Sequence, residues 1–391
     1  MTRAAFDVVI LGAGTAGCAT ALALHGAGVR DVAIFEAGPS VRNDWVGESL
    51  PPDVSVPLKA LGLWDEFLKD GHESCLGSCA AWGGEHLGYN DFVTNVNGPG
   101  WHIHRPRFDA RLRQAVTALG IPIHSGHRLT NAEALILDGG LRLSMRTDDG
   151  EKTVTARHAV DATGPRGVLA RRMGSRLLCH DLLVFVTATA ALIRGAWPSR
   201  LTMTETVADG WWYAAPLPGN RLSLALATDP VISREKRLER PAKWFKALAA
   251  TRHIGPRLAE KPFGFGPLVV RAVPVSQRES PCGQHWTAVG DAAATFDPLG
   301  SEGIYKALED GIHAAEVIRA ELHNQNRSAH YAARVAANAE DHLTLRRQFY
   351  ALELQWPDSR FWTNRRRSRG RADSRSYDGP VGSQGVLPRV S

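Results

Sequence analysis

The sequence predicts an α/β (α+β) protein of two interleaved domains, and three observations lead to this prediction. Near the N-terminus, apolar strand patterns at 7–11 and 31–36 flank a glycine cluster and a helix of small residues, which together make a βαβ unit. A later apolar strand pattern, 286–289, leads into a Gly-Asp pair almost 280 residues after the glycine cluster. The middle of the chain carries further strand patterns, at 133–147, 152–163, 182–192, 201–208 and 221–228. Together they indicate a Rossmann-like domain, an interleaved β-sheet domain and a C-terminal helix.

The composition is that of an ordinary folded protein. The 391 residues are 44% hydrophobic and 22% charged, which excludes a disordered chain and allows a large buried core. The net charge is +6. A run of arginines near the C-terminus supplies five of those charges: Arg365, Arg366, Arg367, Arg369 and Arg371. Because the remainder is nearly neutral, the charge does not indicate a nucleic-acid partner.

Neither a membrane span nor a metal site is predicted. The uncharged stretch from Val8 to Leu24 approaches the length of a membrane helix, but it contains three glycines and splits into a strand and a helix. Asp7 precedes it, where a signal peptide carries Lys or Arg. The five cysteines form no CxxC pair and have no partners at zinc spacing. We therefore expect a cytoplasmic protein with buried thiols and no metal.

The glycine cluster has the spacing of a dinucleotide-binding turn. Gly12-Ala-Gly14-Thr15-Ala-Gly17 follows the first strand and opens the helix, and Glu36 ends the second strand nineteen residues later. In such a turn the first glycine allows the tight bend, the second lets the backbone approach a pyrophosphate, and the third lets the helix pack on the strand. The helix beginning at Thr15 would offer N–H groups to the phosphates, and Glu36 would bind a ribose.

The Gly-Asp pair extends this to a large cofactor. Gly290-Asp291 alone is a helix-cap signal, but paired with the first motif it resembles the FAD-binding enzymes of the p-hydroxybenzoate hydroxylase type. The resemblance implies that Asp291 holds the ribityl chain of FAD. It assigns three more residues to the FAD site: Arg105 of Arg-Pro-Arg-Phe-Asp, Gly164 of Asp-Ala-Thr-Gly, and Ser49 of Trp45-Val-Gly-Glu-Ser-Leu-Pro-Pro.

Two later segments resemble flavin-dependent tryptophan halogenases. The first is Asp297-Pro-Leu-Gly300-Ser301-Glu302-Gly303, similar to their loop-to-helix segment at the pyrimidine end of the flavin. The resemblance brings Gly300, Ser301 and Gly303 to the cofactor. The second is Gly210-Trp211-Trp212-Tyr213-Ala-Ala-Pro216, similar to the segment that separates flavin from substrate, with Tyr213 in place of its second Trp. An open groove rimmed by Trp211, Trp212 and Tyr213 would admit an indole ring.

The residues that halogenation requires are missing. Cys75 aligns with the lysine that activates hypohalous acid, and Gly300 replaces the catalytic acid. Glu302 occupies the halide position, where a carboxylate would repel chloride. The pattern therefore favours a flavin enzyme that does not halogenate.

The whole pattern, including Phe349 to Trp362, is most similar to flavoproteins that mature quinone-cofactor amine oxidases and dehydrogenases. The resemblance implies hydroxylation of a tryptophan side chain in a partner polypeptide, toward tryptophylquinone, through a flavin C4a-hydroperoxide in a water-poor pocket. FAD, NAD(P)H and O2 take part, and NAD(P)H acts at the flavin directly or through a partner reductase. Glu302 would orient or deprotonate the ring N–H, and Trp211 and Tyr213 would line the reacting ring.

Other functions remain open from the sequence. A small-molecule indole or phenol monooxygenase or halogenase would use the same cofactor. A flavin reductase of an isoprenoid double bond would need no oxygen, so oxygen consumption with NADH separates it from a monooxygenase. A nucleic-acid binder would depend on the basic C-terminal residues and would not be yellow.

The motifs also predict where the domains divide. The FAD-binding domain takes 1–70, 102–172 and 275–345, and the substrate domain takes 71–101 and 173–274. A helical segment, 346–364, follows, and 365–391 is expected to be a basic, disordered tail.

Overall fold

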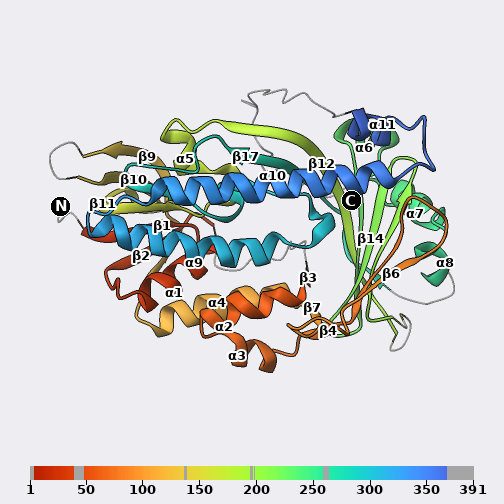
Figure 1. Ribbon diagram of the computed structural model, residues 1–391, viewed down its shortest axis with the longest axis horizontal. Helices are drawn as coiled ribbons and strands as arrows, with labels where there is room; N and C mark the ends of the chain where they lie inside the picture. Colours follow the sequence, from red (N-terminus) through yellow and green to blue (C-terminus); the bar gives the residue numbers. More distant parts are fainter. Residues whose placement is uncertain are drawn as a thin grey trace.

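Two large sheets lie side by side along the long axis of the molecule, and one long helix crosses both (Figure 1). The computed structural model describes residues 4–38, 48–135, 139–193, 197, 199–258 and 264–367. Two parts of the sequence motifs lie outside these residues: 45–47 of the Gly-Glu-Ser segment and the chain after 367.

The first sheet has the parallel core of a nucleotide-binding domain. Its strand order is β18-β19-β11-β1-β2-β8, and the five strands from β19 to β8 are parallel. These are β19 (Trp286–Ala288), β11 (Gly150–Asp161), β1 (Ala4–Leu11), β2 (Val32–Glu36) and β8 (Ile123–Ser125). Antiparallel strands extend it: β9 (Arg128–Ala134), β10 (Leu141–Thr147) and β18 (Cys282–Gly283). The predicted βαβ unit is confirmed.

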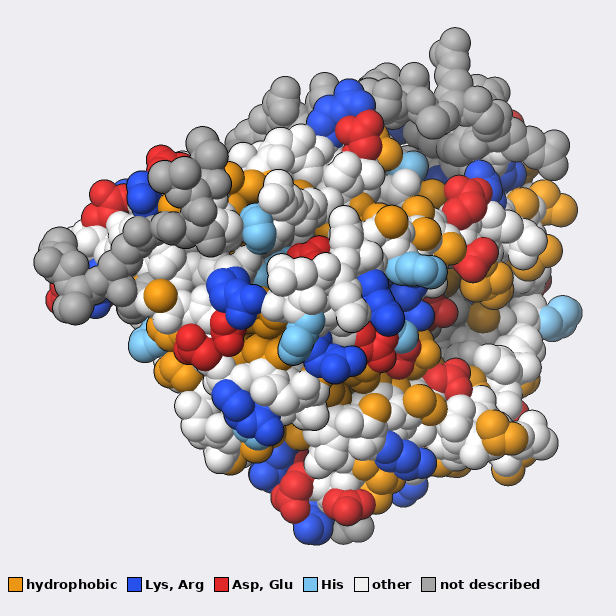
Figure 2. All heavy atoms as spheres, turned by 60° about the vertical axis from the view of Figure 1, so that its left-hand side comes forward, with side chains coloured by type: hydrophobic (Ala, Val, Ile, Leu, Met, Phe, Trp, Pro, Cys, Tyr) orange, Lys and Arg blue, Asp and Glu red, His pale blue; other side chains and the backbone are white. Residues whose placement is uncertain are grey.

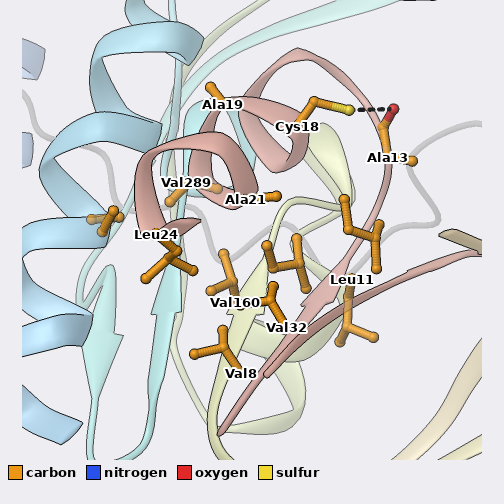
Figure 3. Packing of buried hydrophobic residues seen from close by; sticks show 14 of the residues in the cluster. Val8, Leu11, Ala13, Cys18, Ala19, Ala21, Leu24, Val32, Val160 and Val289 are labelled. Atoms are coloured by element: carbon orange, nitrogen blue, oxygen red, sulfur yellow. Dashed lines mark hydrogen bonds between the residues drawn. The ribbon is translucent and has the colours of Figure 1, made fainter. Parts of the chain in front are cut away.

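Helix α1 (Thr15–Gly26) covers this sheet, and its apolar side chains meet those of the strands. Figure 3 shows Leu24, Val8, Val32 and Val160 converging from α1, β1, β2 and β11, all nearly inaccessible to solvent. Helix α9 (Gly303–Leu322) packs against α1 so closely that a Cβ at Gly311 would lie 2.8 Å from the Ala19 Cβ. This close contact joins the first glycine motif to the segment that follows the Gly-Asp pair.

The second sheet is mostly antiparallel, with the order β20-β17-β12-β15-β14-β13-β5-β6. Its first strands are β20 (Ala294–Thr295), β17 (Val269–Arg278), β12 (Leu177–Ala191) and β15 (Arg221–Thr228). The others are β14 (Gly210–Leu217), β13 (Thr202–Val207), β5 (Gly77–Ala81), β6 (Gly88–Asp91) and, beside β12, β16 (Gly264–Phe265). Three helices follow β15: α6 (Pro230–Lys236), α7 (Pro241–Ala249) and α8 (Ile254–Leu258). One hydrophobic cluster covers each face of this sheet.

A small third sheet lies where the two large sheets meet. It consists of β3 (Ser49–Leu50), β7 (Gly100–His102) and β4 (Glu73–Cys75), all antiparallel. Nearby helices are α2 (Ser55–Ala60), α3 (Trp64–Lys69) and α4 (Arg105–Ala118), and α5 (Val168–Arg172) follows β11. Four short 3-10 turns complete this part: Pro52–Val54, Gly164–Arg166, Gly290–Ala292 and Pro298–Gly300.

The prediction that a disordered basic tail begins at Arg365 is wrong, because the C-terminal helices extend past this residue. Helix α10 (Ser328–Leu352) crosses both sheets, and α11 (Arg360–Arg367) follows it (Figure 1). Phe361, Trp362 and Arg365 are buried, so the tail does not begin at Arg365. Arg365 is buried because its guanidinium pairs with Asp181 and Asp229 at 2.9 and 2.7 Å.

The surface carries mixed charge. Figure 2 shows basic and acidic side chains interspersed over one face, with hydrophobic side chains between them. This face therefore has no broad field of one sign that would attract a polyanion.

Candidate functional site

The first glycine motif contains two positions that close packing requires. Gly12 has a φ of +108°, and a Cβ there would lie 2.3 Å from the Ala162 carbonyl oxygen. A Cβ at Gly17 would lie 2.0 Å from the Gly12 carbonyl oxygen. Both glycines bring the β1–α1 turn against the end of β11, where the Ala162 N–H donates to the Leu11 carbonyl at 2.9 Å.

Gly14 differs from these two glycines. It precedes α1 with an ordinary φ of −81°, and a Cβ there would meet no atom of the described residues within 4 Å. Within that part of the chain, no side chain caps the helix that begins at Thr15. An open space at an uncapped helix N-terminus is a cradle for a phosphate, so the turn fits the pyrophosphate of FAD.

Glu36 lies beside this turn, as the spacing predicts. Its carboxylate accepts the Ala13 N–H and the Gly38 N–H, both at 2.9 Å. Arg113 of α4 approaches the same carboxylate at 3.9 Å. Because a carboxylate can accept about four hydrogen bonds, Glu36 can hold the turn and still accept a ribose hydroxyl.

The backbone of Gly290 is held by a buried ion pair, here called the clamp, which was not predicted from the sequence. Lys306 and Asp310, one turn apart on α9, pair at 2.8 Å and are 6% and 2% exposed. Lys306 donates to the Gly290 carbonyl at 2.8 Å, and the Gly290 N–H donates to Asp310 at 3.1 Å. The one sequence feature that could have predicted this ion pair is the i,i+4 spacing of Lys306 and Asp310 on the apolar face of the predicted helix. The clamp fixes the backbone that leads into Asp291.

Asp291 lies in the electrostatic field of two cationic side chains from distant parts of the sequence. Burial raises the pKa of its carboxyl, while Lys306 and Arg105 act in the opposite direction. Arg105 begins α4 and pairs with Asp109 at 3.2 Å. Gly164 follows β11, and a Cβ there would meet no atom of the described residues within 4 Å. Asp291 and Arg105 are thus within electrostatic range of each other, and both fit a polyhydroxylated, phosphate-bearing cofactor.

The loop before α9 holds Glu302 at the N-terminus of that helix. Ser301 adopts the left-handed conformation, with a φ of +54°, between the 3-10 turn that ends at Gly300 and the helix that begins at Gly303. A Cβ at Gly303 would likewise meet no atom of the described part of the chain within 4 Å. The Glu302 side chain is 41% exposed, so its carboxylate can reach a ligand.

His342 of α10 positions both ends of this loop. Its Nε2 accepts the Asp297 N–H at 2.8 Å, and its ring stacks on Phe296 with centroids 4.2 Å apart. In the neutral ring the hydrogen therefore sits on Nδ1, which lies 3.8 Å from a Glu302 carboxylate oxygen. Sequence reasoning missed His342, which lies in a helix 40 residues after Glu302.

The expectation that Trp211 and Trp212 rim an open groove is wrong. They are 1% and 0% exposed. Successive residues of β14 point to opposite faces of the sheet, and a hydrophobic cluster covers each face, so both side chains are buried. Trp212 packs with Trp244 on one face, and Trp211 donates to the Tyr350 hydroxyl at 3.0 Å on the other. Tyr213 shares the face of Trp211 and is partly exposed.

Ser49 and Cys75 meet at the small third sheet. The Ser49 Oγ lies 2.6 Å from the Tyr213 hydroxyl and 3.1 Å from Thr202 Oγ1. Cys75 is 2% exposed, and its Sγ lies 3.1 Å from the Gly77 carbonyl oxygen and 3.8 Å from Thr202. The sulfur that aligns with the halogenase lysine is thus enclosed among hydroxyl and backbone groups.

Two properties concern the described part of the chain as a whole. It contains no group of three or more His, Cys, Asp or Glu side chains that could hold a metal ion. It also contains no helix that is both long and apolar enough to cross a membrane.

The stability of the protein is expected to fall between pH 6.5 and pH 4 because of His102. This residue is 0% exposed, and burial lowers its pKa to about 4. Histidine in the unfolded chain titrates near 6.5, so the unfolded state binds more protons throughout this window. We expect a loss of up to about 1.4 kcal/mol per pH unit, measured by urea unfolding. His102→Gln should reduce this slope, and an unchanged slope would contradict the assignment.

Comparisons with known proteins agree with this geometry. A family model described as an FAD binding domain matches residues 5–342. The chain is 25% identical over 367 residues to LodB of Marinomonas mediterranea, named as a FAD-dependent oxidoreductase, and the match covers 92% of this chain and 96% of LodB. It is 28% identical over 330 residues to a menaquinone reductase of Mycobacterium tuberculosis, with 80% of this chain and 76% of the reductase covered. The solved structure of the myxobacterial halogenase CndH shares the fold, with a TM-score of 0.82, 20% identity, and 93% and 86% of the two chains covered.

Proposed function

The chain belongs to the FAD-binding-domain family of oxidoreductases, and from this premise we propose that it hydroxylates a tryptophan side chain in a partner polypeptide during quinone-cofactor biogenesis. The proposal rests on two side chains that stand where halogenases have their lysine and their halide-binding position. Cys75 is enclosed where a lysine would be needed, and Glu302 presents a carboxylate where a halide would bind. The near-complete match with LodB in both chains supports an FAD-dependent oxidoreductase. The protein substrate follows from the resemblance to the maturation flavoproteins.

The residues divide the work between holding the cofactor and positioning the ring. The turn at Gly14, the carboxylate of Glu36 and the Gly290-Asp291 backbone would hold FAD. Reduced FAD, once bound, activates O2 for transfer of one oxygen atom to an electron-rich ring. Glu302 would accept the indole N–H and so orient the ring. Tyr213 and Leu299 would bound the ring on the side of the second sheet and exclude water.

Mass spectrometry tests the substrate. The purified holoprotein is incubated with NADH, O2 and an unprocessed amine-oxidase subunit that carries its unmodified tryptophan. We expect one or two oxygen atoms to be added to the subunit and none to free L-tryptophan. Addition to free tryptophan alone, or a chloride-dependent mass shift, would contradict the proposal.

Glu302→Gln tests the role of the carboxylate. The amide keeps the size of the side chain but cannot take a proton, so we expect hydroxylation to slow by about 10²–10⁴-fold with FAD binding unchanged. Glu316→Gln, on the same helix and 67% exposed, is the matched control. The two variants are compared by product mass and by hydrogen peroxide released per O2 consumed. Unchanged hydroxylation and peroxide release in Glu302→Gln would remove Glu302 from the mechanism.

The similarity to a menaquinone reductase favours a second candidate, the reduction of an isoprenoid double bond. That reaction consumes no oxygen. Reduction of a menaquinone side chain under anaerobic conditions, without oxygen uptake in air, would select it over hydroxylation.

A further inference from the structure

A continuous chain of hydrogen bonds runs from Tyr213 into the interior of the protein. The Tyr213 hydroxyl lies 2.6 Å from Ser49 Oγ, which lies 3.1 Å from Thr202 Oγ1. Thr202 Oγ1 in turn lies 3.0 Å from Nε2 of His102. The four side chains come from β14, β3, β13 and β7, so the chain forms where the second sheet meets the small third sheet.

The two ends of this chain have different surroundings. Tyr213 is partly exposed and packs in the same cluster as Leu299, beside the loop that carries Glu302. His102 is 0% exposed, and among the described residues its Nδ1 has no hydrogen-bond partner. Tyr213 therefore lies on the side of the second sheet that would bound the proposed substrate, whereas His102 is sealed from solvent.

Burying four linked polar groups at one junction needs an explanation. A hydroxyl or imidazole gains little net stability from a buried hydrogen bond, and apolar side chains of the same shape would fill the junction as well. Linked hydroxyl groups fix the packing of a junction, and unlike apolar groups they can also pass a proton from one to the next.

We propose that His102, Thr202 and Ser49 form a buried proton relay that ends at the hydroxyl group of Tyr213 and serves hydroxylation of the aromatic substrate. This inference rests on the proposed function. Tyr213 is the catalytic residue of the relay, since it faces the ring, and the other three act through it.

The protonation states on both sides suit such a relay. Burial lowers the pKa of His102 to about 4, so at neutral pH the ring is neutral, and with its hydrogen on Nδ1 it can accept at Nε2. Burial, and then the Glu48 carboxylate, raise the pKa of the Tyr213 phenol, so it keeps its proton. Thr202 then donates to His102, Ser49 to Thr202, and Tyr213 to Ser49, which leaves the Tyr213 oxygen free to accept from the substrate.

The proton released by the substrate ring moves in four linked steps. It bonds to the Tyr213 oxygen as the Tyr213 proton passes to Ser49 Oγ, the Ser49 proton to Thr202 Oγ1, and the Thr202 proton to His102 Nε2. Burial disfavours the charged imidazole, so His102 holds this proton briefly and returns it along the same path to the oxygen atom that leaves as water. Overall the ring exchanges a hydrogen for a hydroxyl group, one atom of O2 enters the ring, and the other leaves as water. NAD(P)H supplies two electrons and one hydrogen, and solvent supplies one further proton.

Thr202→Val interrupts the relay at its centre, and Thr202→Ser restores the hydroxyl. Both holoproteins are assayed with the unprocessed amine-oxidase subunit, NADH and O2 in mixtures of H2O and D2O. We expect Thr202→Val to slow hydroxylation by about 10²-fold and Thr202→Ser to remain within about threefold of the native rate. The native rate should depend on deuterium fraction in a curve that indicates several moving protons, and Thr202→Val should lose this curvature. Flavin absorbance and melting temperature verify folding and cofactor loading.

A second measurement does not depend on activity. In protein labelled with ¹⁵N-histidine, the Nε2 resonance of His102, assigned with His102→Gln, should shift in Thr202→Val and stay in place in Thr202→Ser. Thr202→Val that hydroxylates at the native rate, or leaves this resonance unmoved, overturns the relay. A native protein that hydroxylates no polypeptide overturns the proposed function instead, and the resonance alone then decides whether the hydrogen-bonded chain exists.

Discussion

Gly14→Ala is expected to weaken FAD binding by about 10²-fold, or about 2.7 kcal/mol, while the folding stability of the cofactor-free protein changes by less than about 1 kcal/mol. The new methyl group meets no atom of the residues that the structure describes within 4 Å, and the φ of −81° suits alanine, so their fold has no reason to change. The methyl group would instead occupy the space through which a pyrophosphate approaches the N-terminus of α1. Flavin fluorescence titration and thermal unfolding of the cofactor-free protein measure the two effects.

Two other glycines serve as controls for this substitution. Gly12→Ala should destabilise the cofactor-free protein, because its Cβ would lie 2.3 Å from the Ala162 carbonyl oxygen at a φ of +108°. A Cβ at Gly26, at the far end of α1, would meet none of the described atoms within 4 Å, so Gly26→Ala should leave both FAD binding and folding nearly unchanged. Equal FAD affinity in Gly14→Ala and Gly26→Ala would contradict the placement of the phosphates.

Arg346→Met is expected to reduce the free energy of unfolding by about 3–5 kcal/mol, because it leaves the buried Asp297 carboxylate without its cationic partner. The Arg346 guanidinium is 7% exposed, donates to Asp297 at 2.8 Å, and also pairs with Asp181. It stacks on Tyr350, which donates to the same Asp297 carboxylate at 3.0 Å. We also expect weaker FAD binding, because Asp297 begins the loop that carries Glu302.

The adjacent residue provides the matched control for that variant. Arg347 pairs with Glu340 at 3.0 Å, but both side chains are exposed, at 48% and 68%. Arg347→Met should therefore change stability by less than about 1 kcal/mol. Urea unfolding followed by circular dichroism compares the two variants, and equal losses would show that the buried network does not stabilise the fold.

The cofactor site could be predicted from the sequence to a large extent. The spacing of Gly12, Gly14 and Gly17 and the position of Glu36 encode a local turn, and local turns depend on neighbouring residues. The distant Gly290-Asp291 pair was also recognisable, because it too follows a strand and begins a turn. The Lys306–Asp310 clamp beneath it was not recognised, because a charged i,i+4 pair usually lies on a solvated helix face.

The surroundings of Trp211, Trp212 and Arg365 could not be predicted from the sequence, because they depend on tertiary structure. Alternation along β14 predicts that Trp211 and Trp212 point in opposite directions, but the sequence does not say which face meets the flavin-binding loop. The basic run at Arg365 reads as a solvated tail, whereas Asp181 and Asp229, more than 130 residues earlier, bury its first guanidinium. In both cases the decisive partners are distant in the sequence.

By itself, the sequence determined that this protein has a Rossmann-like FAD-binding domain, because that prediction depends on short motifs with a fixed local geometry. The tertiary structure alone decided which side chains meet where the second sheet joins the small third sheet. Ser49, His102, Thr202 and Tyr213 each occupy an unremarkable strand position, and 164 residues separate the hydrogen-bonded Ser49 and Tyr213. No local pattern marks such a chain, because its hydrogen bonds form only when two separate sheets pack together and exclude water from the junction.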